Sequence, residues 1–417
     1  MDKPEGKLTG SRRFRIMFFL GQMPIGIQLP YFVLFLKYSS GMRDSEISLL
    51  TALSGLAIIL FQQVWGYIAD VHISKKLLIG TNLLVSGFLF WSMGGMRNLI
   101  SLLVVFFIFQ VFSTPVIQLL HGLLFAHHGS EKWFGTLRAY ASLGFVVANT
   151  AVGIIADKIT NGSLNFIFPL YFASNCLAAL WLVLLPERQV ATERRPTFVE
   201  VQRYFLRRPP VLLFLITAAI YQVGHSLSYS FQSVLMVELS ADMRVVSSSY
   251  SLAALLELPI FFMASRLIDR FTEERLLAFA ALVQTVRWLL VWHARTAEQI
   301  VFISALHCIT FGLFYAAAIS FINRHAPLQL KASAQTLFAL VYFGVASIVG
   351  NVLGGQIVSG GILEQPIMRI VRYFVPQEFA SPLRNLYLFS SMVAFLSFVC
   401  AVQLARIASA ASKADSA

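Results

Sequence analysis

The amino-acid sequence predicts an all-α membrane protein in which about twelve transmembrane helices form two pseudo-symmetric six-helix bundles. Hydrophobic residues make up 57% of the 417 residues and charged residues only 12%, whereas soluble domains carry about 25% charged residues. The mean hydropathy is +0.73, and apolar windows of about 20 residues, long enough to cross a bilayer, recur along the chain. Short motifs of the first half also return in the second half in the same order, which indicates a duplicated bundle.

The apolar windows fall into two groups that are separated by a polar stretch. The windows begin near Ile16, Ile47, Leu77, Leu99, Phe134 and Phe166, and then near Val211, Val246, Leu276, Ile300, Ala332 and Leu386. Between Pro186 and Pro210 the hydropathy falls and arginines gather. We therefore predict an N-terminal bundle over residues 1–186, a cytoplasmic linker over 187–210 and a C-terminal bundle over 211–417.

Three polar segments outside the windows receive their own predictions. Residues 197–206 have the pattern of a short amphipathic helix at the membrane interface. Apolar residues recur at helical spacing within 359–385, which favours a helix lying on the outer membrane surface. The tail after Arg406 is small and polar, and we predict that it is disordered.

The formal net charge of +12 would suggest nucleic-acid binding in a soluble protein, but loops that face anionic lipid explain it better in a membrane protein. If both termini are cytoplasmic, most Lys and Arg residues lie on the cytoplasmic side, as the positive-inside rule expects. The basic N-terminus precedes a long apolar run with no cleavage pattern, so we expect a retained span. We predict a multi-pass protein of the cell inner (plasma) membrane with no nucleic-acid partner.

Two pairs of motifs carry the internal repeat. The loop after the second span and the loop after the eighth span each hold a helix-ending Asp and basic residues, which suit conformational-switch loops. These residues are Gly66, Asp70, Lys75 and Lys76 in the first half, and Asp269 and Arg270 in the second. In addition, Leu-His-x-x-x-Phe occurs on the fourth span around His121 and on the tenth span around His307.

Ionisable residues inside apolar segments mark the second half. Glu257, Arg287 and His307 lie on three consecutive spans, where a charge costs several kcal/mol, roughly 3 on insertion scales, unless it faces a partner or a watery cavity. We predict that Glu257 carries a proton, that Arg287 tunes its proton affinity, and that His307 relays the proton or binds solute. A packing ion pair between Glu257 and Arg287 is the alternative.

Further polar residues on other spans are candidates for solute binding. Arg138, on the fifth span, has a fork of donors that can hold hydroxyls or a carboxylate, although it could instead snorkel to the headgroups. The first span holds Gln28 and two prolines, which favour a kinked, cavity-lining helix; packing through Gly21 and Gly26 is the alternative. The seventh span offers Tyr221, Gln222, His225 and Tyr229.

These residues resemble the major facilitator superfamily, in particular the branch that holds lactose permease and the phenylpropionate-permease-like transporters. The resemblance covers nearly the whole chain, and its most specific motifs are Phe134-Gly135-x-x-Arg138, Glu257-Leu258-Pro259, Val286-Arg287 and the run that follows Leu306-His307. It implies that Arg138 binds solute, that Arg287 and His307 belong to the proton machinery, and that the two halves alternate access by rocking.

Three departures from lactose permease bear on the solute. The carboxylate expected one turn after His307 is Thr310, and the acidic partner of the sugar-binding arginine is replaced by His121 or Gln118. The stacking tryptophan of the fifth span is replaced by Phe145. The resemblance therefore does not imply galactoside specificity, and Glu257 becomes the expected proton carrier.

The sequence predicts a transporter and no enzyme. It shows no nucleophile elbow, P-loop or metal cluster, and we predict no cofactor and no metal. The leading hypothesis is proton-coupled symport of a small organic solute (sugar-like, nucleoside or aromatic acid) by a monomer whose further partners are protons and membrane lipid. Alternatives are a uniporter or efflux-type transporter, efflux being disfavoured because the first half lacks a membrane acid, and a non-transporting receptor or scaffold.

Overall fold

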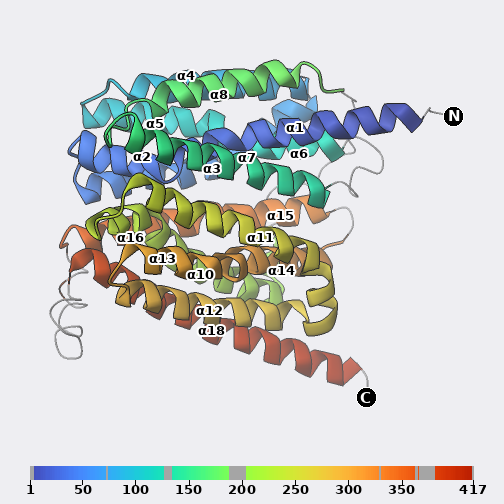
Figure 1. Cartoon of the computed structure of the whole chain (residues 1–417). Helices are drawn as coiled ribbons and strands as arrows, with labels where there is room; N and C mark the ends of the chain where they lie inside the picture. Colours follow the sequence, from blue (N-terminus) through green and yellow to red (C-terminus); the bar gives the residue numbers. More distant parts are fainter. Residues whose placement is uncertain are drawn as a thin grey trace. The chain divides into compact units, whose positions relative to one another are not determined.

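A computed structural model describes residues 4–71, 74–125, 134–186, 203–327, 330–361, 365 and 381–415, and every regular element in these ranges is a helix (Figure 1). The first half contains α1 (Pro4–Gln28), α2 (Tyr31–Leu34), the π-helix η1 (Phe35–Ser39), α3 (Asp44–Val71), α4 (Lys75–Met93), α5 (Leu99–Ser113), α6 (Val116–Phe125), α7 (Phe134–Lys158) and α8 (Ile167–Leu182).

The second half contains more interrupted helices. They are α10 (Pro209–Glu238), α11 (Met243–Phe271), α12 (Glu273–His293), α13 (Ala297–Ile303), the 3₁₀-helix η3 (Ser304–Leu306), the π-helix η4 (Cys308–Leu313), α14 (Phe314–Arg324), α15 (Lys331–Ala339), the π-helix η6 (Leu340–Ala346), α16 (Ser347–Val358) and α18 (Pro382–Asp415). Two of these spans, the tenth and the eleventh, therefore change helix type along their length.

The predicted membrane spans are confirmed. Within the described residues, eleven helical stretches are long and apolar enough to cross a membrane. A shorter apolar helix, α8, stands where the sixth span is predicted. The three cysteines are half-buried within helices and form no disulfide among the described residues, so they act as small apolar residues.

One prediction about the C-terminus is wrong. The helix α18 continues past Arg406 to Asp415, where we expected a disordered tail. The segment after Arg406 reads IASAASKAD, and alanine has the highest intrinsic helix propensity, which favours extension of a helix that is already nucleated. The predicted linker helix and the predicted surface helix fall largely on 187–202, 362–364 and 366–380, which lie outside the described residues.

The helices group into two compact units. The first comprises Met1–Met42, Leu56–Glu193 and Ser240–Leu258, and the second comprises Arg43–Gly55, Arg194–Leu239 and Pro259–Ala417. The start of α3 thus groups with the second unit, and the start of α11 with the first.

The first unit depends on close helix packing. A Cβ atom added at Gly26 would lie 2.5 Å from the carbonyl oxygen of Phe145, and one at Gly144 would overlap the carbonyl of Phe19. Both glycines join α1 to α7, because only a hydrogen side chain lets the backbones approach so closely. Gly26 therefore packs α1 closely against α7, as the alternative interpretation of the first span expected.

The second unit has a core built from α10, α12, α14 and the helices of the eleventh span. Its fully buried side chains include Phe214, Phe314, Phe321, Phe338 and Tyr342. Ring stacking continues through this core, since the rings of Tyr221 and Phe314 lie 3.6 Å apart with an interplanar angle of 8°. This packed core holds the polar groups described next.

Candidate functional site: a buried arginine in the second unit

Arg287 is the centre of a polar cluster inside the second unit. It lies on α12 and its exposed fraction is 0%. Its Nη1 atom lies 2.8 Å from Nδ1 of His307 and donates to Oγ1 of Thr310 at 3.0 Å. Its Nη2 atom donates to Oε1 of Gln232, on α10, at 3.4 Å. One guanidinium therefore ties three spans together, with its charge kept away from water.

The contact with Arg287 fixes the hydrogen on His307. A guanidinium has donors and no acceptor, so Nδ1 of His307 must accept this hydrogen bond and the ring hydrogen sits on Nε2. His307 is 6% exposed. The Nδ1 atom thus accepts the hydrogen bond from Arg287, and the Nε2–H group is left as the hydrogen-bond donor of the ring.

The helix type around His307 also differs from an ordinary α-helix. The 3₁₀-helix η3 ends at Leu306, and the π-helix η4 starts at Cys308. The hydroxyl of Tyr221 donates to the main-chain oxygen of Thr310 inside this π-helix. Single-turn π segments are frequently found at functional sites, because they turn side chains out of the regular register. Here His307 and Thr310 both face Arg287.

Aromatic rings form a ladder beside the guanidinium. The ring of His307 lies 5.3 Å from that of Tyr229 at an interplanar angle of 9°, and 5.3 Å from that of Phe311 at 3°. His225 stacks on Tyr229 at 5.0 Å. On the other side, the guanidinium lies 4.4 Å from the ring centroid of Trp288, a cation–π distance. The cluster combines flat ring faces with charged and neutral donors.

Several buried side-chain atoms near this ladder have no hydrogen-bond partner within the described residues. Two of them are Nδ1 of His225 and Oε1 of Gln222, and both residues are 6% exposed. Gln222 does use its amide nitrogen, which donates to Ser347 at 3.2 Å. A buried polar atom left unsatisfied costs roughly 1–3 kcal/mol, so these two atoms mark places where a solute or water would be bound favourably.

Glu257 belongs to the other unit. It lies on α11, two residues before Pro259, and it is 7% exposed. This part of the first unit ends at Leu258, so the boundary between the units falls one residue after Glu257. Burial of Glu257 agrees with the sequence interpretation, and its approach to Arg287 and His307 stays a prediction.

The candidates of the first half are more accessible. His121 is half-buried on α6, where its ring stacks on Phe18 at 5.5 Å, and it lies close enough to Arg138 for their charges to interact. Arg138 on α7 is half-buried, whereas Gln118 is exposed. Gln28 on α1 and Phe145 on α7 are half-buried. This group is looser than the cluster around Arg287.

The predicted switch-loop residues lie at helix ends. Lys76, in the first turn of α4, donates to the main-chain oxygens of Val183 and Leu185 at 2.8 and 2.7 Å, so it caps the end of α8. Gly66 and Lys75 are half-buried, and Asp269 and Arg270 are exposed at the end of α11. The side chain of Asp70 lies outside the described part of the structure.

Sequence reasoning did not assign a role to several residues of the cluster. Gln232 and Trp288 are not among the candidates that the sequence predicts, whereas Thr310 appears there as a departure from lactose permease and Phe311 as the last residue of the repeated Leu-His-x-x-x-Phe motif. The spacing carried a usable signal, because His307 and Phe311 are four residues apart, as are His225 and Tyr229, which places each pair on one helix face.

Comparisons with known proteins agree with this architecture. A family model described as the MFS_1 like family matches residues 12–364. Maltose permease of Geobacillus stearothermophilus is 25% identical over 352 residues, which cover 83% of this chain and 87% of the permease. An Escherichia coli (strain K12) protein named a probable 3-phenylpropionic acid transporter is 21% identical over 250 residues, which cover 59% of this chain and 65% of that protein.

A solved structure shows the same fold. The crystal structure of the nucleoside transporter NupG matches with a TM-score of 0.78 at 14% sequence identity, covering 94% of this chain and 98% of that protein. The relatives named here are permeases and transporters and not enzymes. The arrangement of helices is thus that of a known membrane transporter.

Proposed function

Because the chain belongs to the MFS_1-like family of membrane transporters, we propose that it is a proton-coupled symporter for a small organic solute, working by alternating access. We further propose a position in the inner (plasma) membrane, with both termini cytoplasmic. The two transport bundles are residues 1–186 and 211–417, and they are joined by the linker 187–210. A monomer carries out the cycle.

One observation carries this proposal: a fully buried arginine is bonded to an imidazole, a hydroxyl and an amide from two neighbouring spans. Burying a guanidinium is costly, so such a group is kept in a membrane protein when it binds a charge that moves or a polar solute. Arg287 can do either. Its hydrogen bonds to His307 and Thr310 can be exchanged for bonds to a carboxylate or hydroxyl without leaving the charge unsatisfied.

The ring ladder favours a solute that contains a ring. Tyr229, His307 and Phe311 present nearly parallel faces, and such faces bind flat or ring-shaped molecules well. Gln222 and His225 add buried polar atoms that a hydroxyl or ring nitrogen would satisfy. Sugars, nucleosides and aromatic acids all meet these requirements. The named relatives include a maltose permease and a nucleoside transporter, which supports this range.

We propose that Glu257 is the residue that binds and releases the proton during transport. It is buried and sits just before Pro259, and proline removes a main-chain hydrogen bond and weakens the helix at that point. Burial destabilises the ionised form of Glu257 more than the protonated, neutral form. A change of burial during the transport cycle would thereby take up and release a proton.

Alternating access requires helix contacts that can be broken and remade, and the start of α11 offers them. Within the first unit, the side-chain amide of Asn149 donates to the main-chain oxygen of Ser247 at 2.7 Å and to Oγ of Ser251 at 2.8 Å. Arg244 pairs with Asp157 at 3.1 Å and with Asp242 at 2.9 Å.

The ion pairs of Arg244 also hold the start of α11, and they are partly exposed to solvent. Burial raises the pKa of Asp242, but hydrogen bonds from the amide of Val245 and from Arg244 outweigh it, so the pKa lies below its usual value. Exposed ion pairs of this kind contribute little stability, about 0–1 kcal/mol each. Contacts this weak can separate during a transport cycle.

Uptake by proteoliposomes with an imposed proton gradient tests the coupling. Maltose, uridine and 3-phenylpropionate, each radiolabelled, serve as probes. We expect one class to accumulate against its gradient when the outside is acidic. Glu257→Gln should abolish accumulation but retain equilibrium exchange, because the solute site is intact. Glu298→Gln, an exposed acid at the start of α13, is the matched control and should behave like the parent.

Three outcomes would replace the proposal. Accumulation that persists unchanged in Glu257→Gln removes the proton role of this residue. Equal counterflow in both directions, with no dependence on pH, would identify a uniporter. Absence of both transport and exchange for every probe that binds would favour a receptor.

A disulfide experiment tests the rocking motion separately from the proton role. The hydroxyl oxygens of Thr150 and Ser251 are 3.0 Å apart, so cysteines at both positions are within reach of a disulfide. Oxidised Thr150→Cys/Ser251→Cys protein should lose transport, and a reductant should restore it. Each single substitution is the control and should transport under both conditions. Full transport by the cross-linked protein would rule out separation of α7 from α11.

A further inference from the structure

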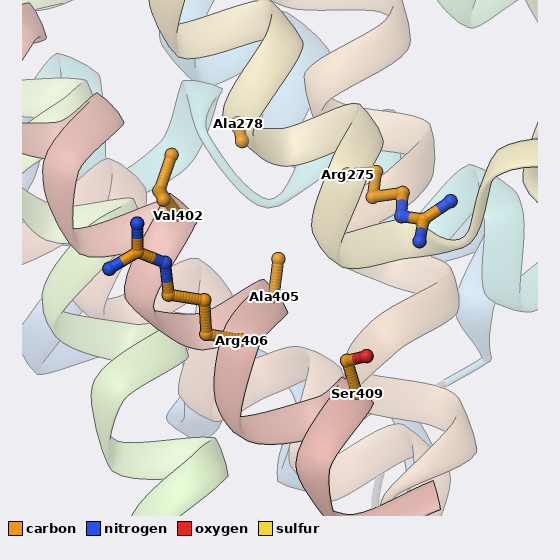
Figure 2. Close-up of a pocket in the computed structure, with 6 residues that line it drawn as sticks. All are labelled: Arg275, Ala278, Val402, Ala405, Arg406 and Ser409. Carbon is orange, nitrogen blue, oxygen red and sulfur yellow. The ribbon is translucent and has the colours of Figure 1, made fainter. Parts of the chain in front are cut away.

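A groove with a basic rim lies between α12 and α18 in the second unit. Its cavity volume is about 340 Å³, and it is lined by Arg275, Ala278, Val402, Ala405, Arg406 and Ser409 (Figure 2). The two helices pack against each other along much of their length (Figure 1). Ala278 and Ala405 contribute small side chains to its lining.

The charges of the groove are positive. Arg275 and Arg406 are exposed, and Figure 2 shows their guanidinium groups on opposite sides of the alanine floor. Within the described residues, neither arginine forms an ion pair. Arg275 also lies in the first turn of α12, where the helix dipole adds partial positive charge.

The acidic residues that precede Arg275 in the sequence already pair with another arginine. Glu273 and Glu274 precede Arg275 on α12, but they are 5% and 3% exposed and both pair with Arg324 on α14. Glu273 also accepts a hydrogen bond from Ser320. The two carboxylates are therefore buried within the unit, where Arg324 compensates one of their two negative charges. At the groove itself, Arg275 and Arg406 are exposed.

The groove lies at the end of two membrane spans. The apolar stretches run from Glu273 to His293 and from Pro382 to Ala410, so Arg275 and Arg406 lie near the boundary between hydrocarbon and headgroups. Deeper along the same helices, large apolar side chains are exposed. They are Phe279, Leu282 and Val286 on α12 and Phe395, Leu396 and Val399 on α18. A basic rim above an apolar face matches the two parts of a phospholipid.

We propose that this groove binds the phosphate of an anionic phospholipid, with the acyl chains lying on the exposed apolar faces of α12 and α18. Arg275 and Arg406 bind the phosphate oxygens, and the hydroxyl of Ser409 adds a donor. The alanine floor leaves room for the headgroup. With the termini cytoplasmic, the lipid belongs to the cytoplasmic leaflet, which is the leaflet rich in anionic lipid.

A lipid at this place would act on the helix that carries Arg287. Arg275 and Arg287 are twelve residues apart on α12, about 18 Å along the axis. Binding of one phosphate by α12 and α18 together would hold these helices in contact at their solvent ends. The lipid therefore stabilises the second unit, and by mass action it raises the melting temperature of the whole protein.

Thermal unfolding of the purified full chain in detergent tests the proposal. Dioleoyl phosphatidylglycerol is titrated against dioleoyl phosphatidylcholine, which has the same chains and no net charge. We expect the anionic lipid to raise the melting temperature more. Arg275→Gln/Arg406→Gln should bind it about tenfold or more weakly, since each surface arginine contributes about 1 kcal/mol to anionic lipid binding. Native mass spectrometry should show the same loss of bound lipid.

Control variants separate this site from general charge effects. Arg207→Gln/Arg266→Gln removes two other exposed arginines and should bind the anionic lipid like the parent. Ala405→Leu fills the groove without changing charge and should weaken binding. It therefore also tests the site if the double arginine variant folds poorly.

Three results would overturn the proposal. One is equal stabilisation by the two lipids, and another is full binding of the anionic lipid by both Arg275→Gln/Arg406→Gln and Ala405→Leu. The third concerns the source of the phosphate: glycerol 3-phosphate, which has no acyl chains, should give no shift at millimolar concentration. A full shift with it would make this a site for soluble phosphate compounds.

Discussion

His121 and His307 occupy matching places in the two halves of the chain, but their surroundings differ. His307 is 6% exposed and its ring nitrogen accepts a hydrogen bond from a fully buried arginine. His121 is half-buried and stacks on Phe18, near a half-buried Arg138. Each half thus pairs a histidine with an arginine. The pair of the second half is the more deeply buried of the two.

The spans that carry these histidines are both interrupted, but in different ways. In the first half the fourth span breaks at Thr114 and Pro115, between α5 and α6. In the second half the tenth span changes to a 3₁₀ turn and then a π-helix on either side of His307. Proline interrupts a helix at a distance from the histidine, whereas the π-helix turns the histidine itself. The duplicated scaffold therefore supports different chemistry in each half.

This difference suggests a division of labour. A buried, bonded charge is expensive to disturb, so the cluster around Arg287 suits a coupling role in which a small change has a large energetic effect. The half-buried pair of the first half can form and lose solute contacts at lower cost. Substitutions in matched pairs can test whether the two halves differ in this way.

The largest effect is expected for Arg287→Gln. Glutamine cannot supply the forked donors, so His307, Thr310 and Gln232 lose their shared partner, and hydrogen bonds to a charged group contribute about 1.5–3 kcal/mol each. Exchange of solute should fall about 100-fold or more, and the melting temperature should fall with it. Exchange assays and thermal unfolding measure both. Arg138→Gln, the matched change, should weaken solute binding while leaving the melting temperature near that of the parent. Equal losses of stability in both variants would contradict the comparison.

The histidines themselves give the next effect. His307→Leu removes the acceptor for Arg287 and one ring of the ladder, so we expect solute to bind about tenfold more weakly, the equivalent of about 1.4 kcal/mol. His121→Leu removes the ring that stacks on Phe18 and should change binding a few-fold. Isothermal titration of both variants measures this. In a double-mutant cycle, Arg287 and His307 should couple more strongly than Arg138 and His121.

The sequence predicted the number and order of spans, because a bilayer imposes length and hydropathy on every one of them. It also singled out Glu257, Arg287 and His307, because an ionisable residue within an apolar run is visible in the sequence alone. The structure joins Arg287 to His307, and the role of Glu257 stays a prediction. It could not predict which neighbours they bond. The partners Gln232 and Thr310 are common polar residues, and their role depends on helix rotation and on a π-helix that leaves no clear mark in composition. The prediction of a disordered tail after Arg406 is wrong for a similar reason: the small polar residues indicate disorder, but the alanine content favours a continued helix.

A smaller and purely structural effect is expected at Gly144. A methyl group there would meet the carbonyl of Phe19, which forces α1 away from α7 and shifts the neighbouring Phe18 that stacks on His121. Overpacking of this kind costs roughly 1–3 kcal/mol. Gly144→Ala should therefore lower the melting temperature and disturb the first-half pair only. At Gly224 of the second unit an added Cβ would lie 3.1 Å from the carbonyl oxygen of Ser390, a contact that a small shift relieves. A larger loss in Gly224→Ala would reverse the expected order.

The smallest effect is expected at Gln118, three residues before His121 on α6. Its side chain is exposed, so Gln118→Ala removes no buried hydrogen bond and should change solute binding by less than about twofold, within the usual range for surface substitutions. Gln222→Ala is the matched change in the second unit, where the side chain is 6% exposed and bonded to Ser347, and it should have the larger effect. Titration of solute into both variants decides the order. If Gln118→Ala weakened binding tenfold, the first half would contain an ordered solute site around His121 and Arg138. The looser packing of that half would then reflect adaptation to solute, because a site that must admit and release a ligand cannot be as closed as the cluster around Arg287.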